Sequence, residues 1–155
     1  MNVVDIMTEA PKTISPQATL YQAIQLMEDN NFMHLPVLSR QKHLVGVISD
    51  RDCRRAINSP YILRERWQDD ELINQLVVRS VMSPAPIIVE PYAPATEAAR
   101  LMLTHNIGCL PVMRAETLIG IVTRSDILAA FMRMYNKIEA LSALAETVNR
   151  NGHVK

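Results

Sequence analysis

One internal repeat fills most of this chain and limits what it can fold into. A shift of 75 positions along the 155-residue sequence places Met7 on Met82 and Leu35-Pro36-Val37 on Leu110-Pro111-Val112. After a turn that is one residue shorter in the second copy, a shift of 74 places Gly46 on Gly120. Self-similarity at a fixed period indicates one supersecondary unit used twice. We therefore expect two copies of one small unit that pack against each other.

Each copy has the same predicted order of elements, β-α-β-β-α. A brief extended stretch, Lys12–Ile14 or Ile87–Val89, precedes an amphipathic helix, and two short apolar strands and a second helix follow. The first helix of the first copy places on one face, at the spacing of a buried stripe, Leu20, Ala23, Ile24 and Met27. A lone three-stranded sheet with one apolar face is barely stable. We predict an α+β protein in which two such units pack sheet to sheet with pseudo-two-fold symmetry and helices outside.

The junction between the last strand and the last helix is the most informative motif. It reads GVISDRD in the first copy and GIVTRSD in the second. Ser49 and Thr123 are good N-cap residues, and a helix that begins there directs unpaired N–H groups and its positive dipole end outward, as a phosphate site requires. The hydroxyl could donate to a phosphate, and Asp52 or Asp126 could accept from ribose hydroxyls. The alternative is a plain capping box, in which the aspartate caps backbone N–H groups.

The doubled unit resembles the CBS domain, the module named after cystathionine β-synthase, whose tandem pair is called a Bateman module. The motifs that carry the resemblance are the two junctions, the Met-Thr or Met-Ser that begins each copy, and the Leu-Pro-Val of each second strand. The resemblance implies regulatory binding of AMP, ADP, ATP or S-adenosylmethionine between the two units, without a required cofactor or chemistry of its own. It also implies a homodimer and an effector protein that cannot be identified from sequence.

The candidate binding residues follow from the junctions and from the resemblance. Backbone groups around Thr13 and Ile88 would read the adenine edge, and two tripeptides would form the wall of the base pocket. Glycine ahead of each junction would permit close approach of the base. The full set is Thr13, His34, Leu35, Pro36, Gly46, Ser49, Arg51, Asp52, Ile88, Cys109, Leu110, Pro111, Gly120, Thr123, Arg124 and Asp126.

The two predicted sites differ in charge just after the hydroxyl. The first has Asp50-Arg51, where the acid favours the helix dipole but repels a phosphate and Arg51 could offset it. The second has Arg124-Ser125, with no acid in those two positions. We expect the second site to tolerate more phosphate charge. The alternative is that these arginines form a solvated helix face.

Composition excludes several other classes. Sixteen basic and sixteen acidic residues balance, so no general charge attracts nucleic acid or a membrane surface. Two cysteines without metal-ligand spacing, four unpaired histidines and an N-terminus without signal-peptide character favour a reduced cytoplasmic protein with no metal site. No nucleophile motif or P-loop occurs, so we expect no enzyme. A structural dimerisation module with vestigial sites remains the alternative function.

The predicted boundaries are a first unit at 3–57, a linker with a short helix from Asp69 at 58–77, a second unit at 78–133 and a helical extension at 134–155. The extension continues an apolar pattern in which spacings of four and three alternate over three heptads, which is typical of a helix pairing with another helix. This seam comprises Ile127, Phe131, Met134, Ile138, Leu141, Ala145 and Val148. We favour a dimer contact; a helix folded back on its own chain is the alternative.

Overall fold

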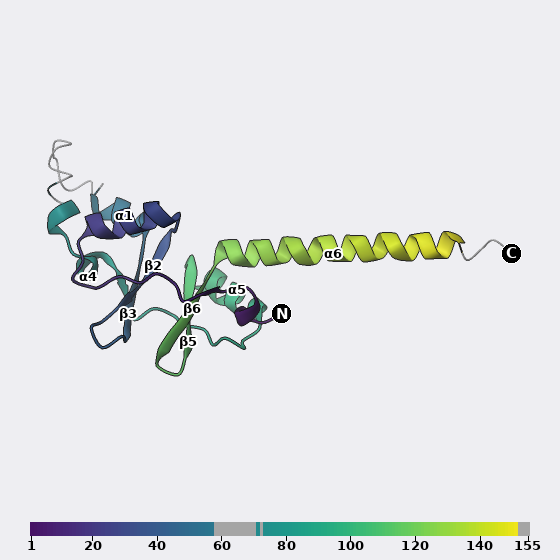
Figure 1. Cartoon of the computed structure of the whole chain (residues 1–155), viewed down its shortest axis with the longest axis horizontal. Coiled ribbons are helices and arrows are strands. Elements are labelled where there is room, and N and C mark those ends of the chain that lie inside the picture. The colour runs from purple at the N-terminus through teal and green to yellow at the C-terminus, as the bar shows by residue number, and fades with distance from the viewer. Residues whose placement is uncertain (58–70, 72, 152–155) are drawn as a thin grey trace.

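The computed structural model describes residues 1–57, 71 and 73–151 (Figure 1). The first half contains the 3-10 helix η1 (Val3–Asp5), β1 (Thr8–Glu9), α1 (Leu20–Asn30), β2 (His34–Leu38), β3 (Leu44–Ser49) and α2 (Asp50–Ile57). The second half contains α4 (Val78–Val81), β4 (Ser83–Pro84), α5 (Ala95–Thr104), β5 (Cys109–Arg114), β6 (Thr117–Thr123) and α6 (Arg124–Asn151). The halves repeat the same order of elements, as the sequence repeat predicts.

Two antiparallel sheets form the centre of the molecule, with strand orders β2-β3-β4 and β1-β6-β5. In each hairpin the first residue lies opposite the junction hydroxyl: His34 faces Ser49, and Cys109 faces Thr123. The predicted extended stretches each contribute one parallel bridge, Ile14 to Val37 and Val89 to Val112, rather than a full strand. The α+β fold of two packed units is confirmed.

The segment that begins each copy joins the sheet of the other copy, which corrects the expectation that each copy builds its own sheet. Strand β1 pairs with β6, and β4 pairs with β3. The exchange extends upstream of these strands, because the Val3 amide donates to the Ala93 carbonyl at 2.9 Å and the Val78 amide donates to the Ala18 carbonyl at 2.8 Å. Figure 1 shows the purple N-terminal segment beside α5 and β6. The two units are therefore interlocked rather than merely stacked.

The junction glycines serve this exchange. A Cβ on Gly46 would lie 2.5 Å from the Met82 sulfur, and a Cβ on Gly120 would lie 2.5 Å from the Met7 sulfur. Both distances are too short for a side chain to be added without movement. Close approach of a base at these glycines stays a prediction, but a methionine of the exchanged segment already occupies the space that a side chain would take.

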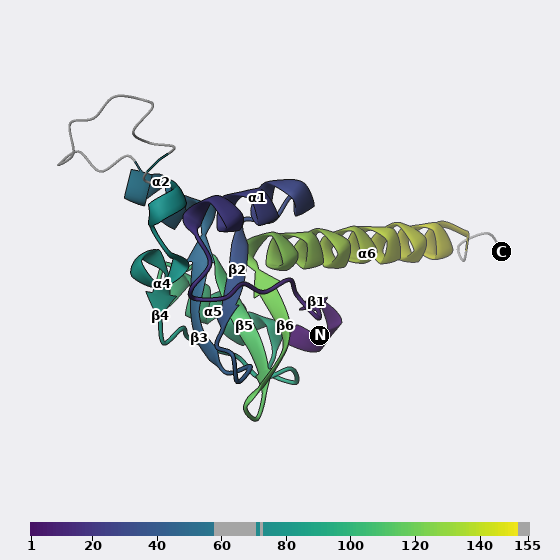
Figure 2. The same ribbon diagram turned by 60° about the vertical axis from the view of Figure 1, so that its left-hand side comes forward.

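Each sheet buries an apolar face under its own helices. The first core joins Leu20, Ala23 and Met27 of α1 to strand residues such as Leu35, and the second joins the matching residues of α5 to Leu110. Between the two sheets a small third cluster contains Val47, Cys109 and Ile121. Figure 2 shows the two hairpins side by side, with α1 and α2 packed against the first. The two junctions thus lie at the same end of the paired sheets.

Helix α1 has a capped start and a sharp end. Thr19 caps it, with its hydroxyl accepting from the Gln22 amide at 3.2 Å while the Gln22 side chain accepts from the Thr19 amide at 3.0 Å. This reciprocal pair is a capping box. Asn31 ends the helix in the left-handed conformation, at φ 55°, which asparagine tolerates better than most residues. The helix therefore turns the chain directly into β2.

The predictions for the two segments outside the repeat, the linker and the C-terminal helix, fare differently. Most of the predicted linker, including Asp69 and Leu72, lies outside the described residues, but Ile73 and Leu76 pack against the first core. Helix α6 runs without a break from the second junction to Asn151, and it leaves the body of the molecule as a single rod (Figures 1 and 2). Every residue from Phe131 to Ala145 is exposed, so the fold-back alternative is wrong.

Candidate functional site

Both junctions form the same hydrogen-bonded cap. Oδ2 of Asp52 accepts from the Ser49 amide at 2.9 Å and from the Ser49 hydroxyl at 2.6 Å. Oδ2 of Asp126 accepts from the Thr123 amide at 2.8 Å and from the Thr123 hydroxyl at 2.7 Å. In return, each hydroxyl oxygen accepts from the amide of its aspartate, at 3.2 and 3.4 Å. The capping box that the sequence left open as an alternative is therefore present twice.

This cap has two consequences for ligand binding. Each junction hydroxyl directs its proton to its own aspartate, so the prediction that it donates to a phosphate does not hold in this conformation. Each carboxylate, however, uses only Oδ2 in the cap. Within the described residues no hydrogen bond reaches Oδ1 of Asp52 or Asp126. A carboxylate oxygen carries two lone pairs, so each Oδ1 can accept from both hydroxyls of a ribose.

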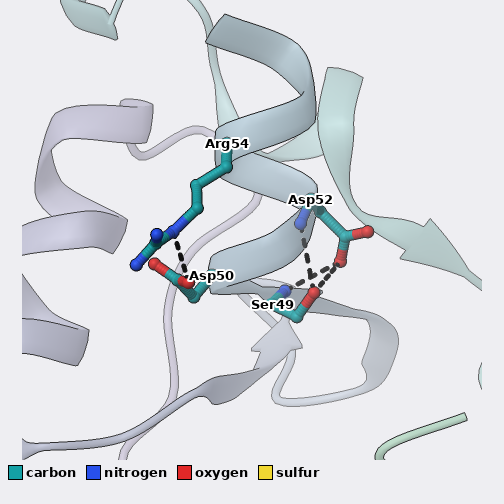
Figure 3. Close-up of polar contacts among 4 residues, drawn as sticks. All are labelled: Ser49, Asp50, Asp52 and Arg54. Atoms are coloured by element: carbon teal, nitrogen blue, oxygen red, sulfur yellow. Dashed lines mark hydrogen bonds and ion pairs between the residues drawn. The ribbon is translucent and has the colours of Figure 1, made fainter. Parts of the chain in front are cut away.

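The first residue of the closing helix carries opposite charge in the two halves, on the same backbone. The Asp50 amide donates to the Met33 carbonyl at 3.1 Å, and the Arg124 amide donates to the Gly108 carbonyl at 3.0 Å, in the equivalent place. Asp50 forms an ion pair with Arg54 at 2.7 Å, so a second arginine, besides the Arg51 expected to offset its charge, acts on this carboxylate. Figure 3 shows Asp50 and Arg54 on one side of α2 and Asp52 on the other. The acid of the first site is therefore turned away from the cap.

Arg124 is held in place by the turn that precedes β5. Its Nε donates to the Ile107 carbonyl at 3.0 Å, and its Nη2 donates to the Asn106 side chain at 3.1 Å. Neither of these two partners of Arg124 was predicted from the sequence. Asn106 was visible as the repeat of Asn31, and both have positive φ, but a backbone carbonyl leaves no mark in a side-chain pattern. Arg124 is thus a fixed cation at the second junction, still exposed to solvent.

His34 lies where the two halves meet. A Cβ on Gly108 would lie only 2.6 Å from Nε2 of His34, so glycine is required for the imidazole to pack over that turn. Burial lowers the pKa of His34 from its ordinary value; Asp52 opposes this shift, and Arg124 and Arg51 add to it. Three charged residues of the two predicted sites therefore act on one imidazole, which places the two junctions close to each other across the interface between the halves.

The lowered pKa predicts that acid destabilises the protein through His34. Because the folded pKa lies below the unfolded value of about 6.5, the unfolded chain binds more protons between these two values. The free energy of unfolding should therefore fall as the pH drops below 6.5, and His34→Gln should flatten that slope. Denaturant unfolding at a series of pH values measures it, with exposed His43→Gln as the matched control. An unchanged slope in His34→Gln would contradict the assignment.

The strand residues predicted as the pocket wall divide between two environments. Leu35 and Leu110 are fully buried in the cores under α1 and α5, so their side chains do not line a cleft, contrary to the prediction. Their side chains face the helices because successive strand residues point to opposite faces of a sheet. Pro36 and Pro111 are also fully buried. Their carbonyls accept from the Ile14 and Val89 amides, both at 3.0 Å.

Cys109 lies on the face between the two sheets, only 7% exposed. Burial is the main cause that raises the pKa of its thiol to about 12, with Asp52 of the other half adding to the shift. Burial likewise raises the pKa of Cys53 to about 11. Neither thiol has the lowered pKa of a reactive cysteine. Cys109 is therefore an apolar residue of the face between the sheets, not a reactive thiol.

The adenine-reading positions lie apart from the two caps. Ile88 lines an open surface cavity of about 350 Å³ at the hairpin ends of the sheets. The cavity brings residues of both halves together: His43, Leu44, Ala85, Pro86, Ile88, Met113 and Glu116. Ile88 is the only predicted site residue among them. Thr13, its counterpart, is exposed next to the bridge between Ile14 and Val37. No residue of either cap is among the residues that line this cavity.

Two further properties of the described residues bear on the class of site. No group of three or more histidine, cysteine, aspartate or glutamate side chains comes together among them as a set of metal ligands. None of the helices described is both long and apolar enough to cross a membrane. What the described residues do bring together is a pair of capped helix starts, a fixed arginine and a shared histidine.

Two interlocked α+β units, with facing sheets and matched hydroxyl–aspartate caps, define a tandem module with pseudo-two-fold symmetry. The family model of the CBS domain matches residues 3–59 and 78–133, and this chain belongs to the CBS domain family. The resemblance seen in the sequence is thereby confirmed.

Relatives and solved structures share this fold over nearly the whole chain. A CBS domain-containing protein of Dictyostelium discoideum is 34% identical over 137 residues, which cover 88% of this chain and 94% of that protein. The crystal structure of CBSX2 from Arabidopsis thaliana in complex with AMP has a TM-score of 0.69 and 29% identity, covering 86% of this chain and 98% of that one. The CBS domain pair of protein MJ0100, with 5-methylthioadenosine and S-adenosylmethionine, has a TM-score of 0.71 and 26% identity, covering 84% and 99%.

Proposed function

We propose that this protein binds adenosine-containing ligands at its two junctions and acts as a regulatory module without chemistry of its own. The observation that carries the proposal is Oδ1 of Asp52 and of Asp126, which accepts no hydrogen bond within the described residues, near the start of a helix and within two residues of an arginine in sequence. The AMP complex of CBSX2 and the S-adenosylmethionine complex of MJ0100 support this ligand class. The ligand is AMP, ADP, ATP or S-adenosylmethionine.

Each part of the ligand has a proposed partner. Asp52 and Asp126 accept from the ribose hydroxyls through Oδ1, which leaves the caps intact. Arg51 and Arg124 attract the phosphates or, with S-adenosylmethionine, its carboxylate. Backbone groups around Thr13 and Ile88 bind the adenine edge, and the half-buried His34 ring supplies apolar surface beside it. All of these groups are present before a ligand arrives, which lowers the entropic cost of binding.

The regulatory role requires partners. Because we propose no chemistry for this protein, a bound ligand can have an effect only through another molecule. We propose that the protein is a homodimer and that it acts on an effector protein. Ligand binding can alter this interaction only to the extent that the ligand prefers one conformation of the module. For a ligand at one junction to affect the other, the two junctions must be in contact. The interlocked sheets join them, and His34 interacts electrostatically with charged residues of both.

The second candidate function is a structural dimerisation module with vestigial sites. The completed capping boxes favour it, because Ser49 and Thr123 are satisfied by Asp52 and Asp126 without any ligand. A capping box of this kind contributes about 1 kcal/mol to stability and explains these residues by itself. The two candidate functions therefore differ in one observable, whether an adenosine compound binds the folded state.

Thermal unfolding in the presence of ligands tests this directly. A ligand that binds only the folded state adds about 2.7 kcal/mol to the free energy of unfolding at 100 times its dissociation constant. We expect at least one of AMP, ADP, ATP and S-adenosylmethionine to raise the melting temperature, whereas guanosine monophosphate at the same concentration should raise it less. If no adenosine compound shifts the transition, the binding proposal is wrong and the structural module remains.

A further inference from the structure

Helix α6 separates from the body of the protein after Ala130. Ala130 is buried in the second core, and from the next residue every side chain up to Ala145 is exposed. Figures 1 and 2 show the same rod projecting away from the sheets in both views. A single helix without a packed face gains little stability in water. The helix therefore needs a stabilising contact that the described part of this chain does not supply.

The exposed part of α6 carries an apolar seam with the period of a paired helix. Phe131, Met134, Ile138, Leu141 and Ala145 follow one another at spacings of three and four. This average of 3.5 residues keeps one stripe facing a partner when two helices supercoil, whereas 3.6 would fit a straight helix lying on a globular surface. Eight large apolar side chains on α6 are between 50% and 63% exposed: Leu128, Phe131, Met132, Met134, Tyr135, Ile138, Leu141 and Leu144.

We infer that the partner on this seam is α6 of a second copy of the chain. In heptad terms Phe131 and Ile138 occupy position a, while Met134 and Leu141 occupy position d. The flanking positions e and g select partners by charge. Between Leu128 and Leu144 these positions hold Leu128, Ala130, Tyr135, Lys137, Ser142 and Leu144. Lys137 is the one charged residue among these six.

This charge pattern favours self-pairing over pairing with a helix of a different protein. In a parallel pair of identical helices, position g faces position e of the next heptad, so Lys137 lies opposite Ser142 and no like charges meet. A different partner chosen by charge would need charged e and g positions to recognise. The apolar flanks instead widen the seam, as in bundles and obligate homodimers. From residue 131 to 145 the seam is roughly 21 Å long at 1.5 Å per residue.

The inference does not depend on nucleotide binding, and a matched pair of variants tests it. Leu141→Glu places a charge in the seam. Ala140→Glu places the same charge on the preceding residue, which lies outside the seam. Both positions are exposed in this chain, so neither change disturbs the cores. Sedimentation velocity over a wide range of concentrations should show dimers for the unmodified chain and for Ala140→Glu. Leu141→Glu should weaken the dimer at least about a hundredfold, because pairing would bury an unpaired charge.

A truncation after Tyr135 gives a second, independent test, since it removes Ile138, Leu141 and Ala145 and, from 136 to 145, only exposed side chains. We expect this chain to be monomeric, with the unfolding transition of the body retained. Three results would overturn the inference: an unmodified chain that is monomeric, a dimer that survives the truncation, or equal weakening by Leu141→Glu and Ala140→Glu. A larger assembly of copies that Leu141→Glu dissociates and Ala140→Glu does not would support it.

Discussion

Deletion of residues 1–9 is expected to destabilise the second half of the protein by at least about 3 kcal/mol, although these residues begin the first copy. The deletion removes Val3 and Ile6 from the second core, and burial of one such side chain contributes about 1.5–3 kcal/mol. It also removes β1, which pairs with β6. Without Met7, the space beside Gly120 is left empty, which adds the cost of a cavity.

Hydrogen exchange together with denaturant unfolding measures this effect. We expect the amides of α5, β5 and β6 to lose protection first, while those of α1, β2 and β3 keep theirs. The matched control is the full chain with Thr8→Ala and Glu9→Ala, two exposed positions of β1 whose side chains enter neither core. Loss of protection confined to α1, β2 and β3 would show that the N-terminal segment stabilises its own copy and that the exchange is absent in solution.

This exchange could not be predicted from the repeat, and the reason is physical. Because the copies are alike, Met7 against Gly46 and Met7 against Gly120 would bury similar surfaces. The same holds for Met82. A repeat therefore predicts that each segment packs beside a junction glycine of one copy but not which copy it is. The choice between them depends on long-range packing, which similarity between the copies does not specify.

The parts of the fold that follow from local chemistry were predictable. The amphipathic stripe of α1, its cap at Thr19 and the strand pairs that begin at His34 and Cys109 each follow from residues near one another in sequence. The candidate site was less predictable, because its residues can serve either a ligand or the helix cap. The same spacing that makes Asp52 a ribose acceptor makes it the partner of Ser49 in a cap, and in the structure Oδ2 serves the cap while Oδ1 stays open.

The partners of the arginines were also hidden from sequence. Arg51 was expected to neutralise Asp50, but Arg54 lies one helical turn after Asp50, at the i, i+4 spacing that suits an ion pair. Arg124 binds a carbonyl and an asparagine of the turn before β5, seventeen residues or more away in sequence. These contacts do not change the charge contrast between the two junctions. They fix the positions of the Asp50 and Arg124 side chains.

Substitution of Asp126 is expected to weaken ATP binding more than AMP binding, and substitution of Asp52 is expected to do the reverse. The variants are Asp52→Asn and Asp126→Asn. Asparagine keeps one oxygen to accept from the cap, so the helix start survives, but it presents an NH₂ group in place of Oδ1. A hydrogen bond to a charged group is worth about 1.5–3 kcal/mol, so each variant should lose roughly tenfold to a hundredfold in affinity at its own site.

The preference between ligands comes from the first residue of each helix. Arg124 adds a fixed positive charge beside the second cap, where a triphosphate gains more than a monophosphate. Asp50 places a negative charge in the first turn of the first closing helix, although its side chain turns away from the cap, and Arg54 neutralises it only in part because the arginine side chain is largely exposed. Reversal of the charge with Arg124→Asp should therefore remove the ATP preference of the second site while leaving AMP binding at the first.

Isothermal titration of AMP and ATP into each variant measures these affinities, with Asp29→Asn as a control at an exposed position near the end of α1. If the unmodified chain binds and both aspartate variants lose both ligands equally, the two junctions have no separate preference and the charge contrast plays no part in selection. If it binds and neither variant loses affinity, the ribose is held elsewhere, and the cavity beside Ile88 becomes the site to mutate. Only the expected pattern assigns one ligand class to each junction, because it alone requires the carboxylate and the first helical residue to act on the same bound molecule.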